Sequence, residues 1–157
     1  NGYLYRHIRV QGGAYGGSCR YEPLCGLFAF LSYRDPHLTE TLDIYRHAVE
    51  AALKDRVPQD EMEKAVIGAI GALDRPLDPA GRGYTALIRE FAGLTDADRS
   101  RFRGEILDAT PESLQEAARR YFTEAAGASV VAVCASEERL REANESLAEK
   151  MTLEKLI

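Results

Sequence analysis

Arg9 and Tyr15 are the two residues of this chain whose types and spacing best suit chemistry. They flank and interrupt a glycine-rich segment, in which four of the six residues from 12 to 17 are glycines. A guanidinium and a phenol both donate hydrogen bonds to a carbonyl or to a developing oxyanion. Because glycine has no side chain, a ligand chain can approach this backbone closely. The predicted contact positions are Gly12, Gly13, Ala14 and Gly16.

Each of these features also has an ordinary structural explanation. Residue types alone favour a surface ion pair for Arg9 and packing within a sheet for Tyr15. The glycines lack the Lys-Ser/Thr of a phosphate-binding loop, and a helical pattern precedes them where a dinucleotide-binding fold has a strand. A helix C-cap followed by a bulged strand therefore explains the glycines better than phosphate binding does.

A zinc site within this chain is not expected. The three histidines are His7, His37 and His47, and neither His-x-x-Glu-His nor Cys-x-x-Cys occurs. His37 and His47 would lie about 15 Å apart along one helix, too far to share a metal. We predict no metal ligands and no cofactor for this chain.

A nucleophile with a partner base is also absent from the pattern. Ser18, Cys19, Cys25 and Ser32 have no histidine or acid at a spacing that would activate them. We expect all four to be small buried side chains.

Composition limits the remaining classes of function. The chain has 157 residues, a net charge of −5 and a pI near 5.3, so nothing electrostatic favours nucleic acid as a partner. No apolar run approaches the roughly 18–20 residues of a membrane span, so no membrane partner is predicted. Three cysteines without paired spacing favour reduced thiols. The chain starts at Asn1 within a helical pattern, and we expect it to be a fragment of a longer protein.

Hydrophobic periodicity and capping signals predict the order of the elements. A short helix should stop before Gly12, an antiparallel hairpin should follow, and a buried strand should occupy Ser129–Cys134. The expected helices start at Asp35-Pro36, Pro58, Asp78-Pro79, a Thr95/Asp98 capping box, Thr110-Pro111 and Ser136.

This order is typical of an α+β fold, with helices packed on a small, mainly antiparallel sheet in a single domain over residues 1–157. Three strands are few for so many helices. We therefore expect the fragment to lack its first strands and to expose a sheet edge that favours dimerisation.

Two motifs together resemble a known family. Residues 9–16, Arg-Val-Gln-Gly-Gly-Ala-Tyr-Gly, followed by Ser-Tyr-Arg-Asp-Pro at 32–36, are similar to the last domain of presequence-protease-type zinc metallopeptidases of the pitrilysin/insulinase clan. Thr41-Leu42, Asp74-Arg75-Pro76 and Gly81-Arg82-Gly83 extend the resemblance over nearly the whole chain.

The resemblance implies a fold of the pitrilysin-type, LuxS-like kind and a role in peptide hydrolysis. In that family four homologous domains enclose a chamber, and the N-terminal domain binds zinc through an inverted His-x-x-Glu-His motif. In that family an arginine and a tyrosine of the last domain contact the substrate. Arg9 would then bind a substrate carbonyl and Tyr15 would donate to the oxyanion. Gln11 departs from the family, which usually has a charged residue there.

The implied protein is a zinc-dependent oligopeptidase that degrades short unstructured peptides, and this chain alone would be inactive. Its partners would be the N-terminal domains of the parent chain and the peptide substrate. Its compartment would be the cytoplasm of a bacterium or an organelle matrix of a eukaryote. The alternative is a non-catalytic structural or assembly subunit on the same fold.

Overall fold

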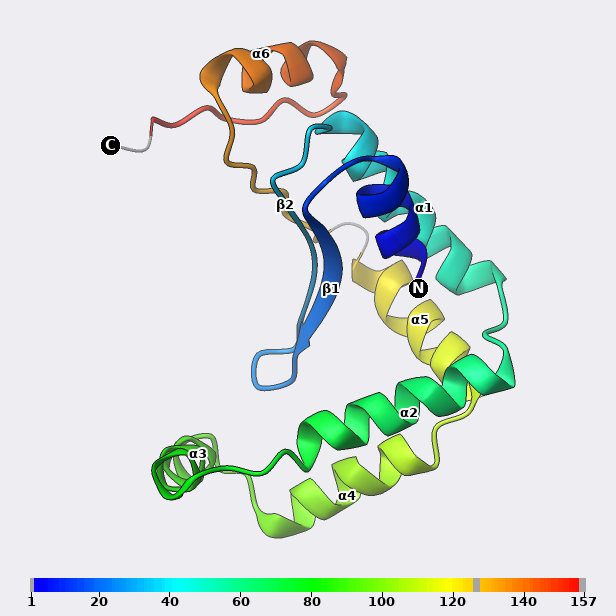
Figure 1. The fold of residues 1–157 in the computed structure, drawn as a ribbon, viewed down its shortest axis with the longest axis vertical. Helices are drawn as coiled ribbons and strands as arrows, with labels where there is room; N and C mark the ends of the chain where they lie inside the picture. The colour runs from blue at the N-terminus through cyan, green and yellow to red at the C-terminus, as the bar shows by residue number, and fades with distance from the viewer. Residues whose placement is uncertain (1, 126–127, 156–157) are drawn as a thin grey trace. The chain divides into compact units, whose positions relative to one another are not determined.

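The computed structural model describes residues 2–125 and 128–155 (Figure 1). In chain order the elements are η1 (Tyr5–Gln11), β1 (Gly16–Glu22), β2 (Leu27–Tyr33), α1 (Thr39–Lys54), α2 (Gln59–Leu73), α3 (Pro79–Phe91), α4 (Asp96–Leu107), α5 (Pro111–Ala125) and α6 (Glu137–Ser146). Helices dominate and the sheet is a two-stranded antiparallel one, so the predicted α+β class is confirmed.

The chain divides into two compact units. One unit combines Asn1–Ala51 with Phe122–Ile157, and the other is Ala52–Tyr121. The first unit contains η1, the β1–β2 hairpin, all of α6 and most of α1. It carries both Arg9 and Tyr15. The second unit contains α2, α3 and α4.

The predicted hairpin is confirmed. β1 and β2 pair from Gly16 opposite Tyr33 to Glu22 opposite Leu27, and a turn with Gly26 at φ +66° joins them. Glycine suits that left-handed position because it has no Cβ to clash with the backbone. The register leaves Tyr15 and Arg34 next to each other at the open end of the hairpin.

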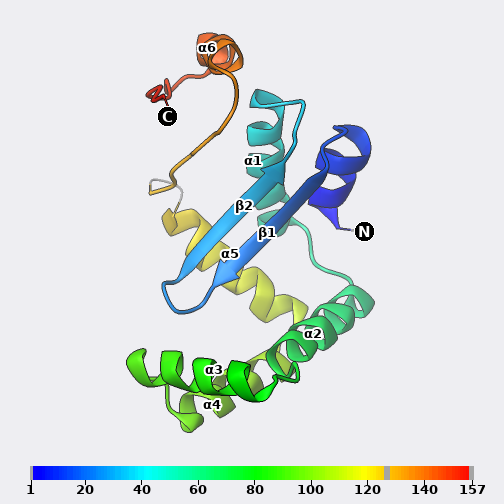
Figure 2. The same ribbon diagram turned by 60° about the vertical axis from the view of Figure 1, so that its left-hand side comes forward.

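Aromatic side chains of β2 pack against α1, the helix that lies beside β2 in Figure 2. Phe30 stacks on Tyr45 of α1 with ring centres 5.1 Å apart, and Phe28 meets Phe122 edge-on at 5.1 Å. Burial raises the pKa of the Tyr45 phenol, as expected for a hydroxyl removed from water. This packing holds the segment between β2 and α1 in place.

The helix expected before the glycines is present, and its hydrogen bonds are those of a π-helix. Ile8 of this helix is 1% exposed, and its side chain lies against Gly17 of β1. Gly12 donates its N–H to the carbonyl of His7 at 2.9 Å, and Gly13 follows with φ +72°. The glycines therefore end the helix, which confirms the C-cap interpretation.

Capping residues of the second unit also match the sequence. The Asp78 side chain accepts the N–H of Gly81 at 2.7 Å at the start of α3, and Thr95 and Asp98 form a complete capping box at the start of α4. The Arg103 guanidinium donates to Asp74 at 2.9 Å, which ties the end of α2 to α4. Phe102 of α4 is 39% exposed.

The predicted strand at Ser129–Cys134 is wrong. This segment has no secondary structure, and Val130 and Val131 are 91% and 51% exposed. A strand requires a neighbour to pair with its N–H and C=O groups. Within residues 2–125 and 128–155 only β1 and β2 pair, so apolar composition alone did not produce a strand here.

The predicted start of the helix at Asp35-Pro36 is also wrong, since α1 begins at Thr39. Asp35 instead closes a turn, because its Oδ1 accepts the N–H of His37 at 2.9 Å and its Oδ2 accepts the hydroxyl of Thr41 at 2.8 Å. An aspartate before a proline favours such a turn as well as a helix cap.

The prediction of four small buried side chains is wrong as well. Ser18, Cys19, Cys25 and Ser32 are all exposed, because each lies on the hairpin or its turn rather than beneath it.

Candidate substrate-binding site

Tyr15 lies one residue before β1 and is 67% exposed. Its backbone N–H donates to the carbonyl of Arg34 at 3.4 Å. Its ring meets the ring of Tyr33 edge-on, with centres 6.0 Å apart and planes at 87°. Tyr15 is therefore not packed within the sheet, and its phenol is open to a ligand.

Arg9 occupies the last turn of η1 and is exposed. Its guanidinium carbon lies 5.4 Å from the centre of the Tyr5 ring. No carboxylate within the described ranges pairs with Arg9, so the surface ion pair considered for it does not form there. Arg9 and Tyr15 are held by different neighbours, and no hydrogen bond or ring contact among the described residues joins them.

The four predicted backbone contact positions differ in accessibility. A Cβ at Gly12 would lie 2.7 Å from the carbonyl oxygen of Ile8, so glycine is required there by the helix end. Ala14 is 3% exposed, and its N–H donates to the same carbonyl at 3.1 Å. A Cβ at Gly16 would meet nothing within 4 Å, and one at Gly13 would only touch Pro36 at 3.9 Å. Open space for a ligand backbone is therefore greatest at Gly13 and Gly16.

Sequence reasoning did not identify Tyr33 and Arg34 as members of this site. The Arg34 guanidinium carbon lies 5.9 Å from the Tyr15 ring centre and 5.5 Å from that of Tyr33. Both residues belong to the Ser-Tyr-Arg-Asp-Pro motif, which was the available signal. The hairpin register brings this motif to Tyr15, and the register becomes visible only in three dimensions.

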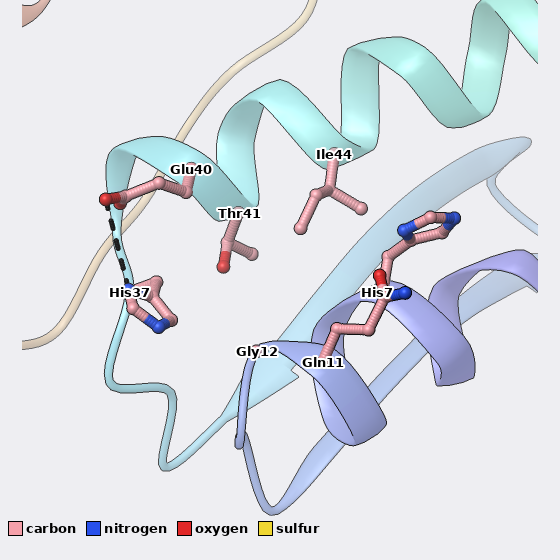
Figure 3. A pocket seen from close by; sticks show the side chains of 7 residues that line it. All are labelled: His7, Gln11, Gly12, His37, Glu40, Thr41 and Ile44. Atoms are coloured by element: carbon pink, nitrogen blue, oxygen red, sulfur yellow. Dashed lines mark ion pairs between the residues drawn. The ribbon is translucent and has the colours of Figure 1, made fainter.

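A shallow pocket of about 230 Å³ lies beside this site, between η1 and the start of α1 (Figure 3). Its lining comprises His7, Gln11, Gly12, His37, Glu40, Thr41 and Ile44. The His37 Nδ1 lies 3.9 Å from a carboxylate oxygen of Glu40, while the two imidazoles lie at opposite ends of the pocket in Figure 3. The hydroxyl of Thr41 is already used by Asp35.

Among the residues that the structure describes, no three His, Cys, Asp or Glu side chains gather closely enough to hold a metal ion. None of the described helices is both long and apolar enough to cross a bilayer.

Comparison with known families decides the classification. The family described as "PreP C-terminal domain" matches residues 1–137. The chain belongs to this family. As a PreP C-terminal domain it carries Arg9, Tyr15, Tyr33 and Arg34 inside the matched range. The resemblance found in the sequence is confirmed.

Relatives of this PreP C-terminal domain are presequence proteases. The chain is 41% identical over 119 residues to "Presequence protease 1, chloroplastic/mitochondrial" of Arabidopsis thaliana, covering 76% of this chain and 11% of that protein. It is 37% identical over 119 residues to "Presequence protease, mitochondrial" of Danio rerio, covering 76% of this chain and 11% of that protein. It is 32% identical over 131 residues to the Yarrowia lipolytica protein of that name, covering 83% of this chain and 13% of the relative. The chain thus spans only 11–13% of the length of these relatives.

Proposed function

We propose that this chain is the C-terminal, non-zinc-binding domain, residues 1–137 and the segment after them, of a larger zinc peptidase that degrades short unstructured peptides. In this proposal Tyr15 donates a hydrogen bond to the oxyanion formed at the scissile carbonyl, and Arg9 binds a backbone carbonyl of the substrate. Membership of the PreP C-terminal domain family supports the reaction class. The relatives are named presequence proteases, which supports peptide targeting sequences as the substrate class.

The observation that carries the proposal is the exposure of the Tyr15 phenol. A tyrosine that is 67% exposed contributes little to packing, yet this one is held by its backbone and by its ring. A restrained donor is what oxyanion stabilisation needs, because it need not reorganise as charge develops. Removing one such donor typically lowers kcat by about 10²–10³-fold.

Arg9 and the glycines suit an extended peptide. A guanidinium carries a rigid set of donors, and the side chain of Arg9 is exposed on the last turn of η1. Gly13 and Gly16 leave open space for a peptide backbone. Gly12 and Ala14 belong to the same segment and shape it by ending η1.

Zinc does not fit the residues of this chain that are described. His37 and Glu40 form only a pair, and His7 lies at the far end of the pocket. In the proposal the N-terminal domain of the parent protein would hold the zinc, which would supply Lewis-acid polarisation of the scissile carbonyl. This chain contributes hydrogen-bond donors and no metal ligand.

The partners in this proposal are the N-terminal domains of the parent protein and the peptide substrate. The names of the relatives favour an organelle matrix as the compartment over the cytoplasm of a bacterium. Dimerisation of the isolated chain through a sheet edge stays a prediction, which sedimentation velocity of the 157-residue chain tests.

The test is peptide hydrolysis by the full-length parent protein carrying Tyr15→Phe, at saturating zinc. We expect kcat to fall by about 10²–10³-fold with little change in KM, because only the transition state loses a donor. Tyr21→Phe is the matched control, since Tyr21 is 56% exposed and lies near the turn end of β1, at the opposite end of the strand from Gly16. Arg9→Gln should mainly raise KM.

Unchanged kinetics of Tyr15→Phe would refute the role of Tyr15. The alternative function, a structural or assembly subunit, would gain support if the parent gene encodes no His-x-x-Glu-His motif upstream. The presence of that motif, together with a slow Tyr15→Phe variant, supports the peptidase.

A further inference from the structure

The backbone of Arg34 adopts a conformation that arginine rarely takes. Its φ is +49°, in the left-handed region, where glycine and asparagine are the usual residues. Among the described non-glycine residues, Arg34 is the one with positive φ. A residue held in this region persists only where its surroundings fix it, and such residues gather at functional sites.

Four hydrogen bonds fix the turn that follows Arg34. The Asp35 carboxylate accepts hydrogen bonds from the N–H of His37 at 2.9 Å and from the hydroxyl of Thr41 at 2.8 Å. Thr41 is only 4% exposed, so this anchor is largely shielded from water. From α6, the Arg139 guanidinium donates to the carbonyls of Asp35 and Pro36. The position of Arg34 is therefore set by α1 and α6 as well as by the hairpin.

From this position Arg34 holds Tyr15 in two ways. Its carbonyl accepts the backbone N–H of Tyr15, and its guanidinium carbon lies 5.9 Å from the centre of the Tyr15 ring. The same guanidinium lies 5.5 Å from the Tyr33 ring, whose edge contacts Tyr15. These distances are within the range of cation–π attraction. The ring is restrained on two sides while its hydroxyl has no partner among the described residues.

We propose that Arg34 is a positioning residue, which holds the Tyr15 phenol in the orientation from which its hydroxyl donates to the oxyanion. This inference rests on the role proposed for Tyr15. Glycine would satisfy the left-handed backbone alone, so an arginine at this position points to a role for its side chain. Arg34 acts through Tyr15 and touches no reacting atom.

The experiment compares single and double variants of the full-length parent protein, with kcat and KM measured on an unstructured peptide at saturating zinc. Arg34→Gly removes the side chain and accepts the positive φ, so it separates the guanidinium from the backbone strain. We expect kcat to fall by about 10–100-fold with KM changed less than about twofold, because a misplaced donor affects the transition state. Arg34→Lys keeps a cation near both rings and should recover much of the lost kcat.

The double variant Arg34→Gly/Tyr15→Phe decides whether Arg34 acts through Tyr15. We expect it to be no slower than Tyr15→Phe alone, because a missing hydroxyl cannot be misplaced. Arg20→Ala in β1 is the control for loss of an exposed arginine from the same hairpin. Urea midpoints of all variants identify any loss of folding. Arg34→Asn, which also removes the guanidinium and tolerates a positive φ, provides the kinetic comparison if Arg34→Gly is unfolded.

The outcomes separate the two levels of the proposal. If Tyr15→Phe slows hydrolysis but Arg34→Gly and Arg34→Lys keep full kcat, the positioning role is overturned and the role of Tyr15 stands. Multiplicative effects in the double variant, or a change in KM alone, also overturn the positioning role. If Tyr15→Phe itself has wild-type kinetics, the proposed function fails first.

Discussion

Gly17 of β1 lies directly against Ile8 of η1: a Cβ added at Gly17 would lie 2.8 Å from both Cβ and Cγ2 of Ile8. Ile8 is 1% exposed, so it cannot move into solvent without losing its burial. This contact sets how closely η1, which carries Arg9, approaches the hairpin, which follows Tyr15. The absence of one side chain in β1 thus helps to place the two candidate site residues.

Gly17→Ala should destabilise the 157-residue chain by about 1–3 kcal/mol, because an added methyl group in a filled contact forces its neighbours apart. Gly16→Ala is the matched control, since a Cβ there would meet nothing within 4 Å. Urea denaturation followed by circular dichroism measures both. Equal midpoints for the two variants would contradict the close packing of Gly17 on Ile8.

Thr95→Ala should lower the free energy of unfolding by about 1 kcal/mol, because the Thr95 side chain accepts the N–H of Asp98 in a capping box. Ser136→Ala is a useful comparison. Ser136 is the N-cap of α6 but makes no side-chain cap bond, so its loss should change stability by much less. Thermal unfolding of the two single variants checks the contrast, and an equal loss at both caps would contradict it.

The ion pair between Asp74 and Arg103 should make the second unit sensitive to acid. The hydrogen bonds from Arg103 hold the pKa of the Asp74 carboxyl below its ordinary value. Because the folded pKa is lower than the unfolded one, the contribution is present above the ordinary pKa and is lost as the pH falls through the lowered one. We expect Asp74→Asn to reduce the fall in stability between pH 7 and about pH 3. Urea midpoints at several pH values test this, and parallel curves for the two proteins would refute it.

The purified 157-residue chain should not bind zinc stoichiometrically and should not cleave peptides. The expectation follows from the ligand spacing in the sequence, where no two histidines stand at a spacing that a zinc site uses. Equilibrium dialysis against zinc, followed by metal analysis, measures the first property. Zinc-dependent hydrolysis by the isolated chain would overturn the proposal that the rest of the parent protein holds the zinc and that this domain supplies only hydrogen-bond donors.

The sequence alone determined the features that depend on neighbours along the chain. The glycines ended η1, the hairpin formed from two adjacent segments joined by a short turn, and the Asp78 and Thr95 caps began α3 and α4. Each of these signals acts within a few residues. The two motifs were also sufficient to recognise the family that residues 1–137 confirm.

Only the tertiary structure decided the features that depend on distant partners. Ser129–Cys134 has the composition of a strand but no strand beside it, so it stayed irregular and exposed. Asp35 closed a turn instead of capping α1. Its carboxylate accepts the hydroxyl of Thr41, and its backbone carbonyl accepts the guanidinium of Arg139. Arg34 reached Tyr15 through the hairpin register, although the two lie 19 positions apart in the sequence. Pairing and packing bring such residues together, and local sequence patterns do not contain that information.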